Sequence, residues 1–569
     1  MYSHQENINI LTALLVSYGI KYAVVCPGSR NAAIVHNLNE CPNIACYPVT
    51  DERSAGFYAL GMAQCLGEPV VVCVTSGTAL LNLVPAVAEA FYQHVPIVVV
   101  SADRPVAWID QQDGQTLPQP DALGRFVRKA VSLPEPTNDE HHWHSNRLVN
   151  EVLIACKGKG GGPVHINIPL SEPLFKFDVP TLSPERVIQK VEAKADVASC
   201  QLLFNDLQLA KRPMIVVGQQ SYQQAKHCYS VLNELAQEIP VVYECLGIAI
   251  DDRDQKTSSS AASHFKPSTI DQVLLNWKRA IDNQPDLIIY IGGSFLSKRL
   301  KLFLRKSPSA KTWIVNEEGA IYDTFMNLTG SIEGDASFVL KAVQGHLKSL
   351  KVDHHHVFDS DFQQAWKDAF NQADAARQRF HPSYSQLQAV AGFFEHAKSK
   401  KNYHLHAGNS MSVRLVNIFA EDYVYCNRGV NGIEGSLSTA AGFSLVTDDD
   451  VYCVIGDLSF FYDQNALWHA LNPNFKVLLL NNGGGGIFRS LPGLKDSDAH
   501  QTLISAQHTT TARGICEQNH VQYLSASDEK ELEENMDIFF NQHYDRPVVL
   551  EVFTSQEQDE QAMNEYHQV

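Results

Sequence analysis

The sequence lacks any long hydrophobic run. Its longest apolar stretches, such as PIVVVSA and KVLLLNN, have the length of one strand, whereas a membrane-spanning helix needs about 20 residues. The opening residues, MYSHQENINILTALL, also lack the basic leader and the small-residue cleavage site of a signal peptide. We therefore expect a cytoplasmic protein with no membrane-inserted segment.

Clusters of metal or redox ligands are also scarce. None of the twelve cysteines forms a CxxC pair, and several, Cys26 and Cys73 among them, lie inside apolar segments, so we expect buried free thiols. The histidine-rich stretches at 141–144 and 353–356 lack the regular spacing of metal ligands. No clean GxGxxG motif follows a predicted strand, which disfavours a nicotinamide-binding protein.

Basic residues are in the minority. The chain has 45 lysines and arginines against 63 aspartates and glutamates, a formal net charge of −18. This balance disfavours nucleic acid and anionic membranes as partners. Because salt screens a diffuse charge over about 10 Å, a local arginine cluster can still bind a small anionic substrate.

What the sequence does contain is a repeated alternation of apolar strands and helices. Near-continuous Val/Ile strands, each followed by a helix, predict an α/β fold with parallel sheets covered by helices on both faces. A chain of 569 residues is too long for one core. A Pro/Glu/Ser-rich passage near residue 185 and a polar passage near residue 350 divide it into three predicted domains, 1–184, 185–352 and 353–569.

Two details of this strand assignment are specific enough to be tested. In the first domain, the stretch PIVVVSADRP (96–105) is expected to close the strand series. In the third domain, DYVYCN (422–427) is expected to form a strand between YHLHAGNS and VYCVIGD.

Oxygen ligands follow two strands of the third domain. Asp457 is expected to be exposed at the end of one strand, and Asn482 follows the next, with 24 residues between them, the length of a helix plus a strand. Since ligands of parallel sheets sit beyond the carboxyl strand ends, the two side chains could share Mg²⁺ with a diphosphate. The glycines after Asn482 allow a backbone carbonyl, such as that of Gly484, to be a third ligand. A helix N-cap and an Asn-Gly turn are the structural alternatives.

Arginine also recurs at strand ends, in both the first and the third domain. An isolated surface arginine is usually a solvated charge, but four such positions in two domains indicate an anion-binding region. The four are Arg30, Arg104, Arg414 and Arg428.

The stretch GDLSFFYDQNALW…NN (456–482) resembles the diphosphate-binding motif of thiamin diphosphate enzymes, which begins with Gly-Asp and ends in Asn-Asn. That superfamily combines a pyrimidine-binding domain, a central domain and a diphosphate-binding domain, and it requires a glutamate at the start of a helix in the first of them. Here the matching residue is Glu52 in TDERSAGFYALG. The resemblance implies the thiamin diphosphate-enzyme fold and thiamin diphosphate with Mg²⁺ or Mn²⁺ as cofactors.

A finer resemblance is to the 2-succinyl-5-enolpyruvyl-6-hydroxy-3-cyclohexene-1-carboxylate (SEPHCHC) synthases of menaquinone biosynthesis. The stretches PGSRNAAI, TSGTALLNLVPAVAEA, SADRP, SKRL, GNSMSVR and NRGVNGIEGSLSTAAG are similar to the signatures of that family and occur in the same order. The family joins 2-oxoglutarate, with loss of carbon dioxide, to isochorismate. The resemblance therefore implies a carbon–carbon bond-forming transferase with these two small-molecule substrates.

The same resemblance assigns roles to individual residues. Glu52 would be catalytic and contact the aminopyrimidine, and Ile433 would hold the cofactor in its bent form, although by itself it reads as a core isoleucine. Asp457, Asn482 and Gly484 would hold the metal, and Ile487 and Phe488 would wall the cavity. The three substrate carboxylates would be bound by Ser29, Arg30, Arg104, Gln115, Lys298, Arg299, Ser410, Arg414 and Arg428.

The resemblance further implies a homodimer, or a dimer of dimers, with active sites between chains, because the superfamily bridges the cofactor across two subunits. An alternative is another thiamin diphosphate decarboxylase or carboligase of the acetolactate synthase type, which the arginine set fits poorly. A non-catalytic protein on the same scaffold would be expected to have lost Glu52 or the metal pair, and all three residues are present.

Overall fold

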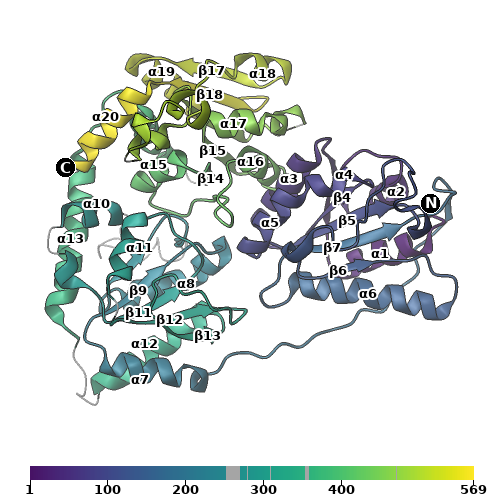
Figure 1. Ribbon diagram of the computed structural model, residues 1–569, viewed down its shortest axis with the longest axis horizontal. Helices are drawn as coiled ribbons and strands as arrows, with labels where there is room; N and C mark the ends of the chain where they lie inside the picture. The colour runs from purple at the N-terminus through teal and green to yellow at the C-terminus, as the bar shows by residue number, and fades with distance from the viewer. Residues whose placement is uncertain are drawn as a thin grey trace.

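The computed structural model describes residues 1–250, 269–277, 280–307, 309–352, 358–400, 402–469, 471–491 and 493–569. The chain forms three α/β bodies, each built on its own parallel sheet, and an extended segment over residues 180–196 joins the first body to the second (Figure 1). The predicted α/β class is therefore confirmed. The domain boundaries remain predictions, and the histidine stretch at 353–356 lies outside the described residues.

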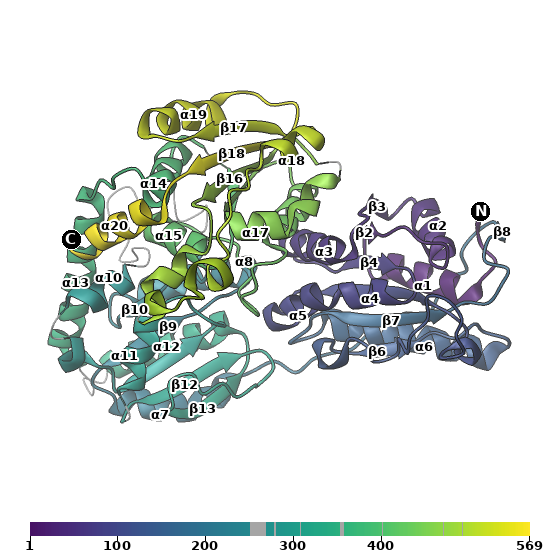
Figure 2. The same cartoon turned by 45° about the horizontal axis from the view of Figure 1, so that its top comes forward.

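The first sheet has six parallel strands in the order β3-β2-β4-β5-β7-β6. Helices α3 and α5 cover one face, while α1, α2 and α6 cover the other (Figure 2). The prediction that PIVVVSADRP closes the series is wrong, because β7 and β6 continue the sheet beyond β5. The elements are α1 Glu6–Ser17, β2 Tyr22–Val25, α2 Ala32–Glu40, β3 Ala45–Pro48, α3 Glu52–Leu66, β4 Val70–Val74, α4 Thr78–Asn82, α5 Val84–Gln93, β5 Ile97–Asp103, β6 Ala130–Ser132, α6 Asp139–Lys157 and β7 Val164–Pro169.

The second sheet has five parallel strands in the order β10-β9-β11-β12-β13. Helices α7, α8 and α12 pack on one face and α10, α11 and α13 on the other. Helix α13 therefore covers the second sheet although it follows residue 352. The elements are α7 Gln201–Leu209, β9 Pro213–Val217, α8 Tyr222–Leu235, β10 Val241–Tyr243, α10 Ile270–Asn276, β11 Leu287–Ile291, α11 Lys298–Arg305, β12 Lys311–Asn316, β13 Leu328–Glu333, α12 Ala336–Val352 and α13 Ser360–Arg379.

The third sheet has five parallel strands in the order β14-β15-β16-β18-β17. Helices α16, α17 and α18 cover one face, and α14, α15, α19 and α20 cover the other. The predicted strand at 422–427 is wrong: Tyr425 forms only an isolated bridge to His406. The elements are α14 Gln386–Ala397, β14 Tyr403–Ala407, α15 Met411–Phe419, α16 Ser436–Ser444, β15 Asp450–Gly456, α17 Asp457–Tyr462, β16 Phe475–Asn481, α18 Arg513–Gln518, β17 Gln522–Ala526, α19 Glu529–Asn541, β18 Val548–Phe553 and α20 Gln556–His567.

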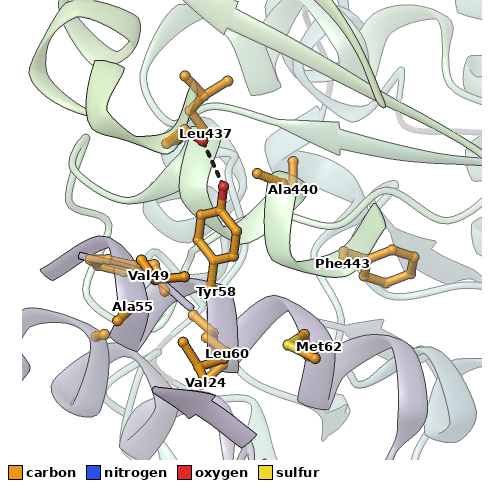
Figure 3. Packing of buried hydrophobic residues seen from close by; sticks show 14 of the residues in the cluster. Val24, Val49, Ala55, Tyr58, Leu60, Met62, Leu437, Ala440 and Phe443 are labelled. Atoms are coloured by element: carbon orange, nitrogen blue, oxygen red, sulfur yellow. Dashed lines mark hydrogen bonds between the residues drawn. The ribbon is translucent and has the colours of Figure 1, made fainter. Parts of the chain in front are cut away.

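The first and third bodies share one hydrophobic core, because α3 packs directly on α16. Figure 3 shows Tyr58 and Met62 of α3 beside Leu437, Ala440 and Phe443 of α16. The Tyr58 hydroxyl donates a hydrogen bond of 2.6 Å to the carbonyl of Ala466. The two sheets are thus separated by two layers of helices whose packing sets how the bodies are oriented.

Strands β1 Tyr2–Ser3 and β8 Phe177–Val179 form a short antiparallel pair that ties the N-terminus to the end of the first body. Among the described residues, none of the helices combines the length and the apolar character that crossing a membrane requires.

Candidate functional site

The two predicted metal ligands lie at adjacent strand ends. Asp457 follows β15 and begins α17, Asn482 follows β16, and these strands are paired in the sheet. The expectation that Asp457 is exposed is wrong, since it is only 4% exposed. Its carboxylate accepts backbone hydrogen bonds from Leu458 (2.6 Å) and Gly484 (3.0 Å), which draw the glycine loop over the strand end.

The donor set at this edge fits a hard divalent cation. The Asn482 amide nitrogen donates to Asp559 at 2.7 Å, so the carboxamide oxygen is the atom left for a metal. His508 Nε2 lies 3.4 Å from Asp457 Oδ2, and the interaction with this carboxylate raises the pKa of His508. The Asp457 carboxylate thus favours a positive charge beside it, as expected for a cation-binding site.

The glycine run after Asn482 has a backbone that other residues would strain. Gly483 has φ +74° and Gly484 has φ +157°, and a Cβ on Gly484 would lie 2.8 Å from the carbonyl of Ser505. Among the described residues, no group of three or more His, Cys, Asp or Glu side chains could hold a metal. A metal here would therefore depend on one carboxylate, one carboxamide and a backbone oxygen, as the sequence indicated.

A polar cavity of about 390 Å³ opens beside Asn482 and Gly483. Its wall includes Arg489, which forms ion pairs with Glu557 (2.7 Å) and Glu560 (3.2 Å) of α20. The other lining residues are Gln507, His508, Thr509, Thr554, Ser555 and Gln556. Sequence reasoning did not single out His508 or Arg489, because both lie in a segment without a recognisable motif.

Glu52 begins α3 at the carboxyl edge of the first sheet. The preceding Asp51 caps this helix by accepting the backbone N–H groups of Arg53 and Ser54. The Glu52 carboxylate accepts a hydrogen bond of 3.2 Å from Asn82 Nδ2 at the end of α4. The helix cap and the catalytic candidate are therefore different residues, and Glu52, in the first turn of α3, also lies where the helix dipole favours a negative charge.

Arg30 and Arg104 lie at the same edge of the first sheet. Arg30 is 8% exposed, donates to the carbonyl of Leu170 at 3.2 Å and faces Glu172 at 3.4 Å. Burial, and then the charge of Arg104, lowers the pKa of Arg30, so the two guanidinium groups are close enough to repel each other. Such a pair favours a bound anion.

The neighbouring residues of this group come from two turns. Ser29 is exposed in the turn after β2. Gln115 has φ +61° and its side chain donates to the carbonyl of Ser76 at 3.1 Å. Gln115 is thereby held against the turn that leads into α4, on the same sheet edge as Glu52.

A buried polar network that sequence reasoning missed supports this edge. Gln119 donates to Asn167 (2.8 Å) and accepts the N–H of Gly77 (2.7 Å). Asn167 in turn donates to Asp103, whose carboxylate accepts the backbone N–H of Arg104, both at 2.8 Å. Only the sheet order, which places β7 beside β5, could have revealed it.

The remaining cations gather where the second and third bodies meet. Lys298 and Arg299 are exposed at the start of α11, and Arg414 of α15 donates to the carbonyl of Leu296 at 3.3 Å. Glu244 holds the start of α11 by accepting the backbone N–H groups of Leu296 and Ser297, and burial raises its pKa to about 7.

Arg428 and Ile433 belong to one loop, residues 426–434, which precedes α16. Burial lowers the pKa of Arg428, and its Nη1 donates to Asn409 Oδ1 at 3.2 Å. Ile433 is half-buried, and Ser410, with φ +69°, precedes α15 next to Asn409. The half-buried Ile487 and Phe488 lie in a short 3₁₀ turn after the glycine run.

Comparison with known proteins gives a consistent result. The family described as thiamine pyrophosphate enzyme, N-terminal TPP binding domain, matches residues 8–123, and the corresponding C-terminal TPP binding domain matches residues 407–552. A SEPHCHC synthase of Bacteroides thetaiotaomicron is 40% identical over 579 residues, which cover 100% of this chain and 99% of the relative. The synthases of Phocaeicola vulgatus (40% over 576 residues; 100% and 99%) and Porphyromonas gingivalis (34% over 575 residues; 99% and 97%) are also similar.

The chain belongs to the SEPHCHC synthase family. The resemblance predicted from the sequence motifs is thus confirmed, as are the thiamine pyrophosphate-binding domains. In this synthase-family chain, Glu52, Arg30, Arg104 and Gln115 fall in the N-terminal match, and Asp457 and Asn482 fall in the C-terminal match. Lys298 and Arg299 lie outside both, in the part that only the full-length relatives cover.

The structure of this family member arranges the candidates in two groups. In the described part of the chain, the hydrogen bonds and ion pairs of Glu52, Arg30 and Arg104 stay within the first body. Those of Arg414 and Arg428 stay within the second and third bodies. Among the described residues, no hydrogen bond or ion pair joins a member of one group directly to a member of the other. The residues beside Glu52 do reach the third body, because Asp51 accepts from Asn465 (2.7 Å) and Arg53 donates to the carbonyl of Tyr462 (2.8 Å).

Proposed function

We propose that the chain catalyses decarboxylation of 2-oxoglutarate and conjugate addition of the remaining four-carbon fragment to isochorismate. The products are SEPHCHC and carbon dioxide, in a step of menaquinone biosynthesis. The observation that carries this proposal is similarity to SEPHCHC synthases along the entire chain, including the second body that supplies Lys298 and Arg299.

Thiamin diphosphate would supply the covalent chemistry when bound, through the thiazolium C2 carbon, whose proton is weakly acidic. Asp457, Asn482 and the carbonyl of Gly484 would hold Mg²⁺ (or Mn²⁺) against its diphosphate. The Glu52 carboxylate, whose present partner is Asn82, would accept or share the proton at N1′ of the aminopyrimidine. Ile433, Ile487 and Phe488 would pack against the cofactor and exclude water.

The two cation groups account for the charge of the substrates. The succinyl fragment keeps one carboxylate and isochorismate brings two, so three anionic groups must be held in a partly desolvated space. Guanidinium groups bind carboxylates in a bidentate manner and stay charged when buried. Arg30 and Arg104, assisted by Ser29 and Gln115, would form one binding region. Lys298, Arg299, Ser410, Arg414 and Arg428 would form the other.

Within the described residues, Glu52 shares no hydrogen bond or ion pair with the metal-binding candidates Asp457 and Asn482, which supports a site between chains. Glu52 lies at the carboxyl edge of the first sheet, whereas Asp457 lies at that of the third. A second copy of the chain could place its third body against the first body of this one. We therefore propose a cytoplasmic homodimer, or a dimer of dimers, in which each active site uses residues from two chains.

The direct test is to mix the purified protein with thiamin diphosphate, Mg²⁺, 2-oxoglutarate and isochorismate, omitting each in turn. Mass spectrometry is expected to detect the SEPHCHC adduct only in the complete mixture. Replacing 2-oxoglutarate by pyruvate separates this activity from one of the acetolactate synthase type. Pyruvate turnover without the adduct would contradict the proposal.

A further inference from the structure

The 426–434 loop, which carries Arg428 and Ile433, is held by all three bodies of the chain. From the third body, Asn409 donates to the carbonyls of Asn427 (2.6 Å) and Gly432 (2.5 Å). From the second, Ser294 donates to the carbonyl of Arg428 at 3.0 Å. The first body reaches the same loop through α5, and that contact has no role in the function proposed above.

The contact from α5 is a buried carboxylate. Glu89 is 3% exposed, and its two oxygens separately accept the backbone N–H groups of Gly429 (2.6 Å) and Val430 (2.7 Å). Gln93, one turn further along α5, donates to Glu89 Oε1 at 2.5 Å. A Cβ on Gly429 would lie 2.8 Å from the carbonyl of Glu89, so the absence of a side chain lets the loop approach the helix.

Burying this carboxylate is costly. Burial raises the pKa of Glu89 despite the three hydrogen bonds that oppose the shift, and the nearby Glu434 raises it further. A helix packed only for stability would be served as well by an apolar side chain, because a buried charge often stabilises less than a hydrophobic residue of its size. The carboxylate instead accepts hydrogen bonds from two successive peptide N–H groups, and these two bonds determine the orientation of the backbone between them.

We propose that Glu89 is a positioning residue for the proposed reaction, on which this inference depends. By holding Gly429 and Val430, it sets the places of the Arg428 guanidinium and the Ile433 side chain on either side of them. The first body would then contribute to the reaction in two ways. It presents Glu52 at its carboxyl edge, and it holds the 426–434 loop in place through α5.

The first test compares Glu89→Gln with Glu318→Gln. Glu318 is a suitable control because it also links the first body to another one, through an ion pair of 2.9 Å with Arg128, but does not contact the 426–434 loop. In the cofactor-free protein, Glu89→Gln is expected to speed hydrogen exchange in peptides covering this loop by about tenfold or more. Glu318→Gln should leave that exchange unchanged.

The second readout is cofactor binding and turnover. Misplacement by about 1 Å can reduce a rate by roughly a hundredfold, so Glu89→Gln should weaken thiamin diphosphate binding and lower kcat by about tenfold to a hundredfold. A purely structural role predicts a lower melting temperature with normal kcat at saturating cofactor. That result, or wild-type exchange in the loop, would overturn the inference. If the wild-type protein makes no adduct, the proposed function is refuted. The hydrogen-exchange comparison would still test whether Glu89 holds the 426–434 loop.

A third test uses mixed dimers of differently tagged Glu52→Gln and Glu89→Gln chains. If sites form between chains, the Glu52 lesion of one chain and the loop lesion of its partner fall in the same site. The second site then has neither lesion, so the mixed dimer should have about half of the wild-type activity. Activity no higher than that of the two parent variants would contradict this assignment of Glu89 to the loop of its own chain.

Discussion

At the scale of single residues, Glu52 is the position with the most specific expected effect. Its carboxylate is not used to cap α3, which Asp51 does, so Glu52→Gln removes an acid without removing a cap. We expect the variant to fold normally and to lose turnover by about a hundredfold or more, the usual range for an acid–base group. Circular dichroism would establish folding and the adduct assay turnover, and near-normal activity would refute the role.

Asp463 is a second residue whose environment makes a testable difference. It is fully buried between α17 and α16, where it accepts hydrogen bonds from the backbone N–H (2.7 Å) and hydroxyl (2.8 Å) of Ser438. Burial raises its pKa from 3.8 to about 7. The folded state therefore binds the proton more tightly than the unfolded state does.

The sign of the resulting pH effect follows from linkage. A group whose pKa is raised by folding contributes stability below its unfolded pKa, and this contribution is lost as the pH rises towards the folded value. Asp463→Asn cannot titrate, so its melting temperature should improve relative to wild type as the pH rises from about 4 to 7. If the difference in melting temperature between the two proteins stays constant over this pH range, the prediction is contradicted.

At the scale of elements, the packing of α3 on α16 leaves no room for an added side chain at Gly61. A Cβ on Gly61 would lie 1.9 Å from the carbonyl of Thr439, and backbone atoms of α16 cannot move away as a flexible side chain could. Gly61→Ala is therefore expected to destabilise the protein by about 1–3 kcal/mol, the usual cost of overpacking.

A glycine elsewhere provides the matched control for this substitution. Gly392 lies inside α14 with nothing within 4 Å of a Cβ, so Gly392→Ala should stabilise the protein by about 0.5–1 kcal/mol through helix propensity. Denaturant unfolding of both variants checks the pair. If both substitutions change the free energy of unfolding equally, α3 and α16 do not pack as closely as the structure indicates.

At the scale of the whole molecule, the two local groups of candidate residues lead to a prediction about assembly. If each active site needs two chains, activity per chain should fall on dilution below the dissociation constant of the dimer. Sedimentation measurements across the same concentration range should show particles of two or four chains where the protein is active. A monomer with full activity would exclude the shared site.

Much of the fold and part of the site could be predicted from local patterns. Apolar strands followed by helices predicted the parallel sheets, and 24 residues between Asp457 and Asn482 predicted adjacent strand ends. Local patterns failed where pairing partners mattered. The stretch 422–427 has the composition of a strand but makes only one bridge, and β7 and β6 lie beyond the expected end of the first sheet.

The sequence by itself determined the chemistry available to this protein and the strand ends at which it is displayed, because covalent spacing and residue type are local properties. Only the tertiary structure decided which of those strand ends lie close together and which side chains hold the loops around them in place. Glu89 and Gly429 are 340 residues apart, and they come together because α5 and the 426–434 loop are packed by sheets formed independently of each other. Contacts of that range depend on the packing of whole bodies, which no local pattern encodes.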